Sequence, residues 1–136
     1  MSSRVVLDTN TIISALLMRS SLPRQAFDRA FDEGVVLVSE ATIAELTEVI
    51  QRPKFDRYVG EEARLLFLAT FLHDSEIVQV TKAITDCRDA NDNKFLEVAV
   101  NGKATAIVSG DEDLLVLNPY RAIQIVTPRQ FVERQI

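Results

Sequence analysis

The sequence predicts a three-layer α/β/α domain with a central, mostly parallel sheet of five strands. Short apolar runs alternate along the chain with longer segments of helical spacing. One of these runs, residues 35–38, is apolar throughout, which is typical of a strand covered on both faces. The 136 residues are 47% hydrophobic and contain no repeat or linker, so we expect a single domain spanning residues 1–136.

One strand and two helices are predicted near the N-terminus. Residues 4–7 form a short apolar strand. The polar triplet Thr9-Asn10-Thr11 supplies helix-capping side chains for a helix over residues 12–18. A second helix, Pro23–Asp32, begins with a proline in its first turn and is expected to end at Gly34.

The middle of the chain predicts a strand followed by two helices. Residues 35–38 form the second strand, and Glu40–Gln51 form the third helix. Pro53 ends that helix, because the residue before a proline avoids the α region. Residues 54–59 are basic, aromatic and irregular, and Glu61–Leu72 has the spacing of an amphipathic helix.

The C-terminal part predicts three strands and three helices. The strands are residues 77–80, 106–108 and 123–126, and the helices are residues 92–100, residues 113–117 and a last segment after Thr127-Pro128. An acid-rich polar loop over residues 86–91 leads into the first of these helices. Gly102 is expected to close that helix, and Thr127-Pro128 has the N-cap and first-turn proline of a helix start.

The composition excludes several classes of protein. No apolar run approaches the roughly 20 residues that span a bilayer, and no apolar secretory signal precedes the first strand. We therefore expect a cytoplasmic protein with no membrane association. The single cysteine, Cys87, excludes an intrachain disulfide and a cysteine-rich zinc site. The single histidine, His73, lies far in sequence from the acidic motifs, and no glycine-rich phosphate loop is present.

The net charge of −5 and the pI near 4.9 argue against strong binding of nucleic acid. Five of the 20 acids, however, lie in four clusters, and without them 15 acids remain against 15 Lys plus Arg. The five are Asp8, Glu45, Asp92, Asp111 and Asp113. If they bind divalent cations, the rest of the chain is formally neutral. A weak or transient interaction with a polyanion is then compatible with the sequence.

The positions of these acids point to a metal site. Asp8 follows the first strand, Asp92 opens the inward face of a helix, and Asp111 follows the fourth strand. The carboxyl ends of parallel strands form the ligand edge of such a sheet. Carboxylates without histidine or cysteine select Mg²⁺ or Mn²⁺ over zinc. Taken singly, each acid is also explained as a helix cap, an acidic turn or a solvated side chain; the joint placement favours the metal site.

Two further acids are placed by local geometry. Glu45 lies on the margin of the apolar stripe of its helix and can reach the lip of a cleft, whereas Glu48 points outward. Asp113 is two residues beyond Asp111 and is expected to face the same cleft. Asp89 is a weaker candidate for the site.

Neutral and basic residues complete the set of candidates. Asn10 and Ser109 are candidate contacts to water or substrate. Arg52 and Lys54 are the better candidates for phosphate-binding cations, because they directly follow the third helix, and Arg57, Arg88 and Lys94 are weaker ones. Taken singly, each basic residue is more often explained as solvated surface charge.

These motifs resemble those of PIN-domain proteins, in particular the VapC-like branch of toxin–antitoxin ribonucleases. The matching segments are VLDTN with Asp8, AELTEVIQRPKF with Glu45, DANDNKFLEVA with Asp92, IVSGDEDLL with Asp111 and Asp113, and the terminal IQIVTPRQFV. The resemblance runs from Arg4 to Phe131. One departure is the Ala90-Asn91 pair, which stands in a loop that is often richer in acid and leaves Asp89 open as a ligand.

The resemblance implies metal-dependent hydrolysis of RNA phosphodiester bonds, leaving 5′-phosphate and 3′-hydroxyl ends. One or two Mg²⁺ or Mn²⁺ ions would be held by Asp8, Asp92 and Asp111, with Asp113 supporting the metal shell. Glu45 would orient water or help to hold the second ion. The implied partners are an RNA substrate and a small antitoxin protein, and the family often forms homodimers.

A catalytically degenerate PIN domain, acting as a binding, scaffold or regulatory module, remains the alternative. A phospho-receiver domain is disfavoured, because the third strand continues into Thr81-Lys82 and the fifth into Thr127-Pro128, so the expected aspartate and lysine are missing. Phosphatases with an Asp-x-Asp motif after the first strand are disfavoured because position 10 is Asn10.

Overall fold

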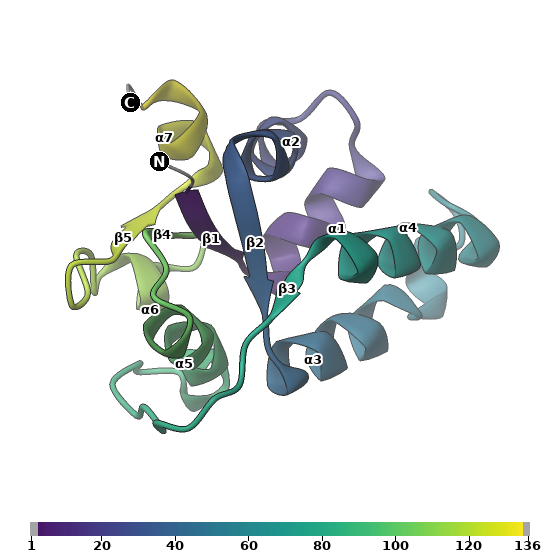
Figure 1. Ribbon diagram of the computed structural model, residues 1–136. Coiled ribbons are helices and arrows are strands. Elements are labelled where there is room, and N and C mark those ends of the chain that lie inside the picture. The colour runs from purple at the N-terminus through teal and green to yellow at the C-terminus, as the bar shows by residue number, and fades with distance from the viewer. Residues whose placement is uncertain (1–2, 135–136) are drawn as a thin grey trace.

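The computed structural model describes residues 3–134 and confirms the three-layer α/β/α fold, with helices on both faces of one parallel sheet (Figure 1). The strands are β1 (Ser3–Leu7), β2 (Gly34–Val38), β3 (Glu76–Ile77), β4 (Ala106–Val108) and β5 (Gln124–Val126). The helices are α1 (Thr9–Leu17), α2 (Leu22–Glu33), α3 (Glu40–Ile50), α4 (Glu61–Asp74), α5 (Asn93–Asn101), α6 (Glu112–Leu115) and α7 (Pro128–Glu133), with 3₁₀ turns η1 (Pro53–Phe55) and η2 (Ala90–Asp92). None of the helices in this part of the chain has the length and apolar character needed to cross a membrane.

The strand order β3-β2-β1-β4-β5 puts β1 at the centre of the sheet. Val5 pairs with Val36 of β2 on one side and with Ala106 of β4 on the other, and Leu7 pairs with Val108. All the pairings are parallel, so the carboxyl ends of β1 and β4 lie side by side at one edge. Residues that directly follow these two strands are brought together there.

Side chains along the central strands alternate between two hydrophobic cores, as the two-residue period of a strand requires. In β1, Val5 and Leu7 belong to one core and Val6 to the other. Helices α1, α2, α3, α4 and α7 fill the first core, and α5 with α6 fills the second. Because both faces of β1, β2 and β4 are covered, these strands are apolar at almost every position.

The third strand is shorter than the prediction of residues 77–80. Only Glu76 and Ile77 pair with β2, and the Val78 N–H donates to the Val38 carbonyl at 2.7 Å before the chain leaves the sheet. β3 lies at the edge of the sheet, so no outer strand holds the following residues in line. The remaining elements agree with their predicted ranges to within a few residues at each end.

Gly34 ends α2, as predicted, and is also the first residue of β2. A Cβ atom at this position would lie 1.9 Å from the Ser3 carbonyl oxygen, so only glycine permits the close approach of β1 and β2 here. Among the described residues no glycine has positive φ, and the space around Gly110 is open, so the turn after β4 does not require glycine there.

The buried side chain of Arg64 links the two helices of the hairpin formed by α3 and α4. The side chain of Arg64 has no exposed surface. Its guanidinium donates to the Ile50 carbonyl at 2.8 Å and to the Val59 carbonyl, and it pairs with Asp56 at 2.9 Å. Ile50 ends α3 and Val59 precedes α4, so a single side chain joins the two helix ends. The amphipathic pattern of α4 did not predict this buried charge.

Candidate functional site

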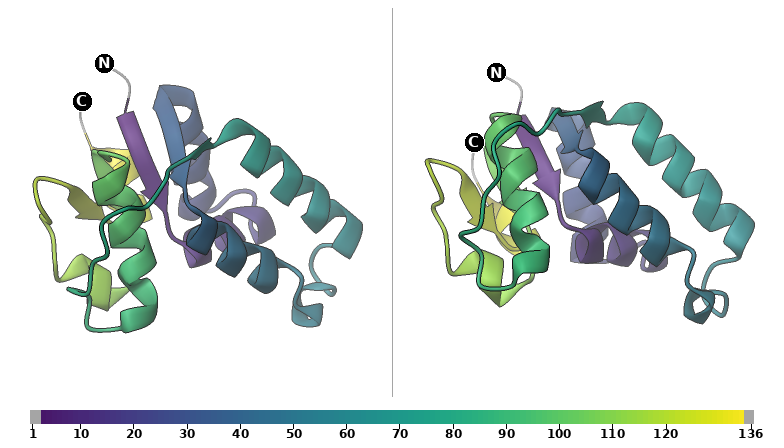
Figure 2. Two further views of the ribbon diagram at one scale, coloured as in Figure 1. Left: turned by 60° about the horizontal axis from the view of Figure 1, so that its bottom comes forward. Right: turned by 90° about the horizontal axis from the view of Figure 1, so that it is seen from below.

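Asp8 lies directly beyond β1, at the carboxyl edge of the sheet. Its backbone N–H donates to the Val108 carbonyl at 3.1 Å and continues the β1–β4 pairing by one residue. Its Oδ1 accepts from the Thr11 N–H at 2.8 Å and so caps α1. The views in Figure 2 show β1 running into α1 between α5 on one side and α3 on the other. The edge of the sheet is therefore enclosed by the starts or flanks of three helices.

A polar cavity of about 270 Å³ opens at this edge. It is lined by five acids, one arginine and smaller side chains: Asp8, Thr9, Asn10, Glu45, Val49, Arg52, Asp89, Asn91, Asp92, Phe95 and Asp111. A larger hollow of about 410 Å³ lies between α2 and α4, but it is lined by four phenylalanines and its three aspartates are exposed. The smaller cavity is the one that collects the predicted site residues.

Ser109 joins two of the acids. Its hydroxyl donates to Oδ2 of Asp8 and accepts from the backbone N–H of Asp111 at 2.9 Å. Ser109 has no exposed surface, and its hydroxyl both donates and accepts inside the protein, so contact with substrate stays a prediction that the structure does not support. Its role is to set the positions of Asp8 and Asp111.

Asp92 is held where its negative charge is poorly tolerated. Burial, followed by the contact with and charge of Asp111 and the charges of Asp89 and Asp8, raises the pKa of Asp92 to about 7. One of its oxygens, Oδ2, is buried without a hydrogen-bond partner. Burial also raises the pKa of Asp8, despite the hydrogen bonds that this carboxylate accepts. This half of the cavity therefore lacks positive charge to offset the repulsion among its aspartates.

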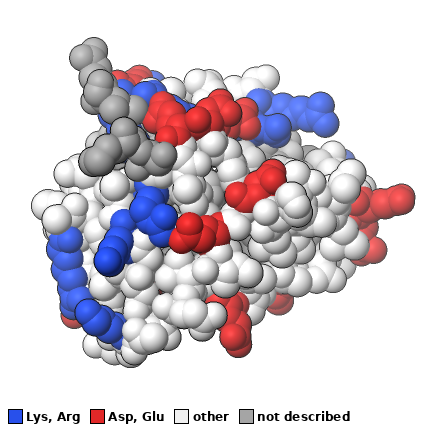
Figure 3. All heavy atoms as spheres, in the orientation of Figure 1, with Lys and Arg blue, Asp and Glu red and all other residues white. Residues whose placement is uncertain are grey.

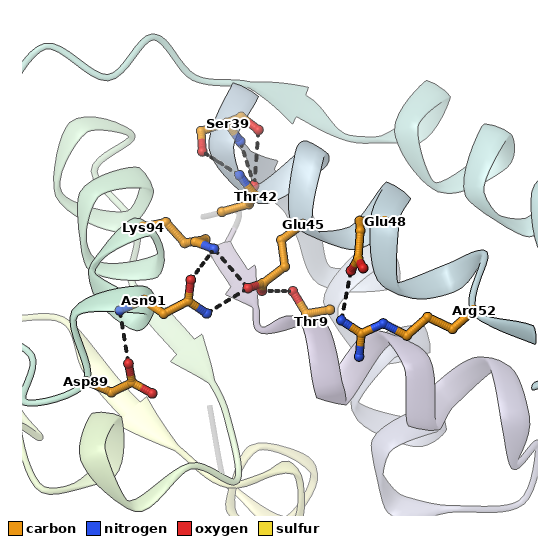
Figure 4. A network of polar contacts seen from close by, with 9 residues as sticks. All are labelled: Thr9, Ser39, Thr42, Glu45, Glu48, Arg52, Asp89, Asn91 and Lys94. Atoms are coloured by element: carbon orange, nitrogen blue, oxygen red, sulfur yellow. Dashed lines mark hydrogen bonds and ion pairs between the residues drawn. The ribbon is translucent and has the colours of Figure 1, made fainter. Parts of the chain in front are cut away.

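Glu45 faces the same cavity from α3 but is fully compensated (Figure 4). Its Oε1 accepts from the Thr9 hydroxyl at 2.5 Å, and its Oε2 accepts from Lys94 at 2.8 Å and from the Asn91 amide at 2.9 Å. Burial alone would raise the pKa of Glu45, but these hydrogen bonds and the charge of Lys94 outweigh it and lower the pKa. Glu45 is thus an ionised carboxylate whose two oxygens both accept hydrogen bonds.

The structure separates the other predicted residues into two groups. Asn10 is exposed and lines the cavity, and Arg52 lines it while pairing with Glu48 at 2.9 Å. Lys54 does not line the cavity; its ammonium lies 5.2 Å from the ring centroid of Phe55 in η1.

Asp113, predicted to join the metal shell, is also not among the residues that line the cavity. Its backbone N–H donates to Oδ1 of Asp111 at 2.8 Å, because Asp111 caps the short helix α6. The backbone of Asp113 therefore orients Asp111, and the role of its side chain in the metal shell stays a prediction. Asp89, which the sequence left open, does line the cavity.

Sequence reasoning missed Thr9 and Asn91, and it did not assign Lys94 to Glu45. One signal was present in the sequence: residues three apart on a helical turn share a face, which is the spacing of Asn91 and Lys94. Lys94 indeed also donates to Oδ1 of Asn91 at 3.1 Å. The identity of their shared partner, however, depends on how α3 packs beside α5.

The cavity suits a hard divalent cation by its chemistry. Among residues 3–134, no three histidine, cysteine or carboxylate side chains already form a metal-binding cluster. Asp8, Asp92 and Asp111 are nevertheless carboxylates, which Mg²⁺ and Mn²⁺ prefer. Asp92 has a buried oxygen without a partner, and the pKa values of Asp8 and Asp92 are raised. Both observations indicate that no positive charge offsets these carboxylates. The donor set therefore fits such an ion.

The raised pKa of Asp92 predicts how the metal-free protein responds to pH. The pKa of Asp92 is about 7 in the folded state, against an ordinary value of 3.8. The preference of the folded protein for protonated Asp92 therefore stabilises it fully below about pH 4, and this stabilisation is lost as the pH rises through about 7. Asparagine does not titrate, so Asp92→Asn does not lose stability through this group as the pH rises. We expect the unfolding free energy of Asp92→Asn relative to the wild type to increase between about pH 5 and about pH 8, by roughly 1 kcal/mol or more.

Urea unfolding of both proteins in EDTA at the two pH values measures this difference. Glu62→Gln, which changes an exposed acid of α4, is the matched control and should show no such trend. A difference between Asp92→Asn and wild type that stays constant with pH would contradict the expectation.

Comparison with protein families gives one match over most of the chain. A family model described as a PIN domain matches residues 4–113. An uncharacterized protein of Methanocaldococcus jannaschii, MJ1680, is 36% identical over 140 residues, which cover 96% of this chain and 90% of that protein.

Three solved structures share the fold. They are PAE2754 from Pyrobaculum aerophilum (TM-score 0.63, 12% identity, 96% of this chain and 87% of that chain), VapBC2 from Rickettsia felis bound to a DNA fragment from their promoter (0.61, 14%, 91% and 98%), and the sarcin-ricin loop cleaving toxin VapC20 from Mycobacterium tuberculosis (0.55, 13%, 88% and 98%). At these identities the likeness concerns the fold.

Proposed function

The chain belongs to the PIN-domain family, and on this premise we propose that it is a Mg²⁺- or Mn²⁺-dependent endoribonuclease. The observation that carries the proposal is the group Asp8, Asp92 and Asp111 in one cavity at the carboxyl edge of β1 and β4. These buried or half-buried aspartates lack a compensating charge within the described residues. An arrangement that is costly without a cation is best explained by chemistry that uses one.

In this proposal the residues of the site have separate roles. Asp8, Asp92 and Asp111 would hold the ion, with Ser109 orienting Asp8 and Asp111 through its hydroxyl. When bound, such an ion lowers the pKa of water in the site and offsets negative charge on the phosphoryl group. Glu45, kept ionised by its partners, presents a carboxylate from the opposite wall.

Arg52 and Asn10 are the proposed contacts to the RNA backbone. Both line the cavity, and both sit at its rim, since each residue is exposed. Lys54 lies two residues further along the chain and would contact the strand beyond the cavity. On the face drawn in Figure 3, basic side chains occur in separate groups among acidic and uncharged ones, with no continuous basic surface. We therefore propose that the protein contacts RNA at the rim of the cavity and binds it weakly without the metal.

A role as the toxin of a toxin–antitoxin pair is part of the proposal. The similar fold of VapC20, described as a toxin that cleaves the sarcin-ricin loop, and of VapBC2, solved on promoter DNA, supports it. The partner would be a small antitoxin protein, and the place of action would be the cytoplasm, where structured RNA is present. The alternative of a degenerate domain that only binds partners draws on the lack of a ready-made metal cluster within residues 3–134.

Cleavage assays with and without metal decide between these functions. We expect the purified protein to cut structured RNA in Mg²⁺ or Mn²⁺, to leave 5′-phosphate ends that are competent for ligation, and to lose activity in EDTA. Restoring either metal in excess should restore cleavage. Cutting that persists in EDTA, or intact RNA under every metal condition, would rule the proposal out.

A further inference from the structure

Lys94 is not itself among the residues that line the acidic cavity, but its ammonium pairs at 2.8 Å with Glu45, one of the five lining acids. Resting on the proposed function, we propose that the Lys94 ammonium takes the place of a second metal ion, so that the site binds a single divalent ion per chain. In this arrangement Glu45 is the counter-charge of Lys94 and not a metal ligand. Lys94 becomes the second positive charge that faces the substrate phosphate.

The first argument is that both oxygens of Glu45 are already hydrogen-bonded. Its two oxygens accept three hydrogen bonds, from Thr9, Asn91 and Lys94, at 2.5, 2.9 and 2.8 Å. The sticks in Figure 4 show the three donors converging on this carboxylate from α1, η2 and α5. A metal ion at Oε2 would compete with the ammonium of Lys94 and the amide of Asn91, and one at Oε1 would compete with the hydroxyl of Thr9.

The second argument is that Lys94 is fixed in place. Its side chain is only 18% exposed, as is that of Glu45, and it donates to two acceptors, Glu45 and Asn91. Asn91 in turn is oriented by Asp89, whose carboxylate accepts from the Asn91 N–H at 3.0 Å. An ammonium group has three donors, and two are used within the described residues. One N–H remains to donate to a phosphate oxygen.

The third argument is the uneven distribution of charge in the cavity. Of its five acids, only Glu45 has an ion-pair partner within residues 3–134. The other four are the aspartates Asp8, Asp89, Asp92 and Asp111, and Asp92 among them has a buried oxygen with no partner. The compensated side and the uncompensated side are thus distinct, and the uncompensated side is the one that attracts an ion. Two-metal sites hold their ions about 3.5–4 Å apart, and in this inference the Lys94 ammonium stands where an ion bound to Glu45 would otherwise lie.

Counting bound Mn²⁺ tests the inference without any RNA. Titration calorimetry, with the signal of unbound Mn²⁺ followed by electron paramagnetic resonance up to millimolar metal, should give one ion per wild-type chain. Lys94→Met frees Glu45, and we expect a second ion to bind. Lys94→Arg keeps the charge and should keep a single ion. The double variant Lys94→Met with Glu45→Gln should lose the second ion, which locates it at Glu45.

Each outcome bears on the inference separately from the proposed function. Two ions on the wild-type chain, or a single ion on Lys94→Met at millimolar Mn²⁺, would overturn the role of Lys94 and leave metal-dependent cleavage standing. One ion on the wild type, two on Lys94→Met and no cleavage of RNA would sustain the role of Lys94 and overturn the proposed function. Circular dichroism of each variant confirms that the fold is retained, and Lys94→Gln replaces Lys94→Met if the latter does not fold.

Discussion

Asp92→Asn is expected to lower metal-dependent RNA cleavage by on the order of 10³-fold, and Asp8→Asn by a similar factor. Asparagine keeps the shape of the side chain but removes the charge that would hold the ion. Asp92 is the sharper test, because its buried oxygen makes no hydrogen bond that the substitution could break. In Asp8→Asn, the amide oxygen can still cap α1 by accepting from Thr11. Initial rates under saturating Mn²⁺ measure both losses.

The structural and catalytic roles of Asp92 predict opposite changes in stability. A residue that only held the fold together would lose stability with activity. Asp92→Asn should instead lose activity while it gains stability in EDTA at about pH 8, since the folded state no longer carries a repelled charge. Glu62→Gln, on an exposed turn of α4, should change neither quantity. Wild-type cleavage rates in both Asp92→Asn and Asp8→Asn would refute the assignment of these carboxylates.

Arg64→Met is expected to cost roughly 2–5 kcal/mol of unfolding free energy, the largest loss of stability that we predict for one side chain, because two carbonyls lose their donor. Methionine fills a similar volume but donates no hydrogen bond. The substitution leaves the buried carbonyl of Ile50 and that of Val59 without their donor and removes the partner of Asp56. Since small domains are stable by about 5–15 kcal/mol, this loss is a large part of the total.

Urea unfolding followed by circular dichroism measures the loss, with two controls from the same hairpin. Arg57→Met removes an exposed arginine and should stay within about 0.5 kcal/mol of the wild type. Arg64→Lys keeps the charge but lacks the planar fork that reaches several acceptors, so it should recover only part of the loss. If Arg64→Met proved as stable as Arg57→Met, the hairpin would not depend on the buried guanidinium.

The order and type of the main elements followed from local chemistry. The apolar runs of β1, β2 and β4, the cap at Thr127 and the proline of α7 are all read from neighbouring residues, and the structure agrees with them. The cluster of Asp8, Asp92 and Asp111 was also predictable. Parallel strands end at a common edge, so acids that follow such strands or open the next helix must meet there.

Contacts between distant elements were not predictable in this way. β3 ends early because it lies at the edge of the sheet, although its apolar pattern continues. Ser109 looks in sequence like a polar residue at a ligand edge, yet it is fully buried and serves Asp8. Arg64 reads as the polar position of an amphipathic helix, yet the turn before α4 folds over it.

Local sequence thus specified the strands, most helix ends and the acids that share one edge, because each depends on residues a few positions apart. Tertiary packing decided which of those acids are charged and which are available. Glu45 and Lys94 are 49 residues apart, and their ion pair exists only because α3 and α5 flank the same end of β1. The same packing buries Asp92 beside Asp111 and raises its pKa. Charge compensation depends on distance in space and on burial, neither of which is written in the spacing of residues along a chain.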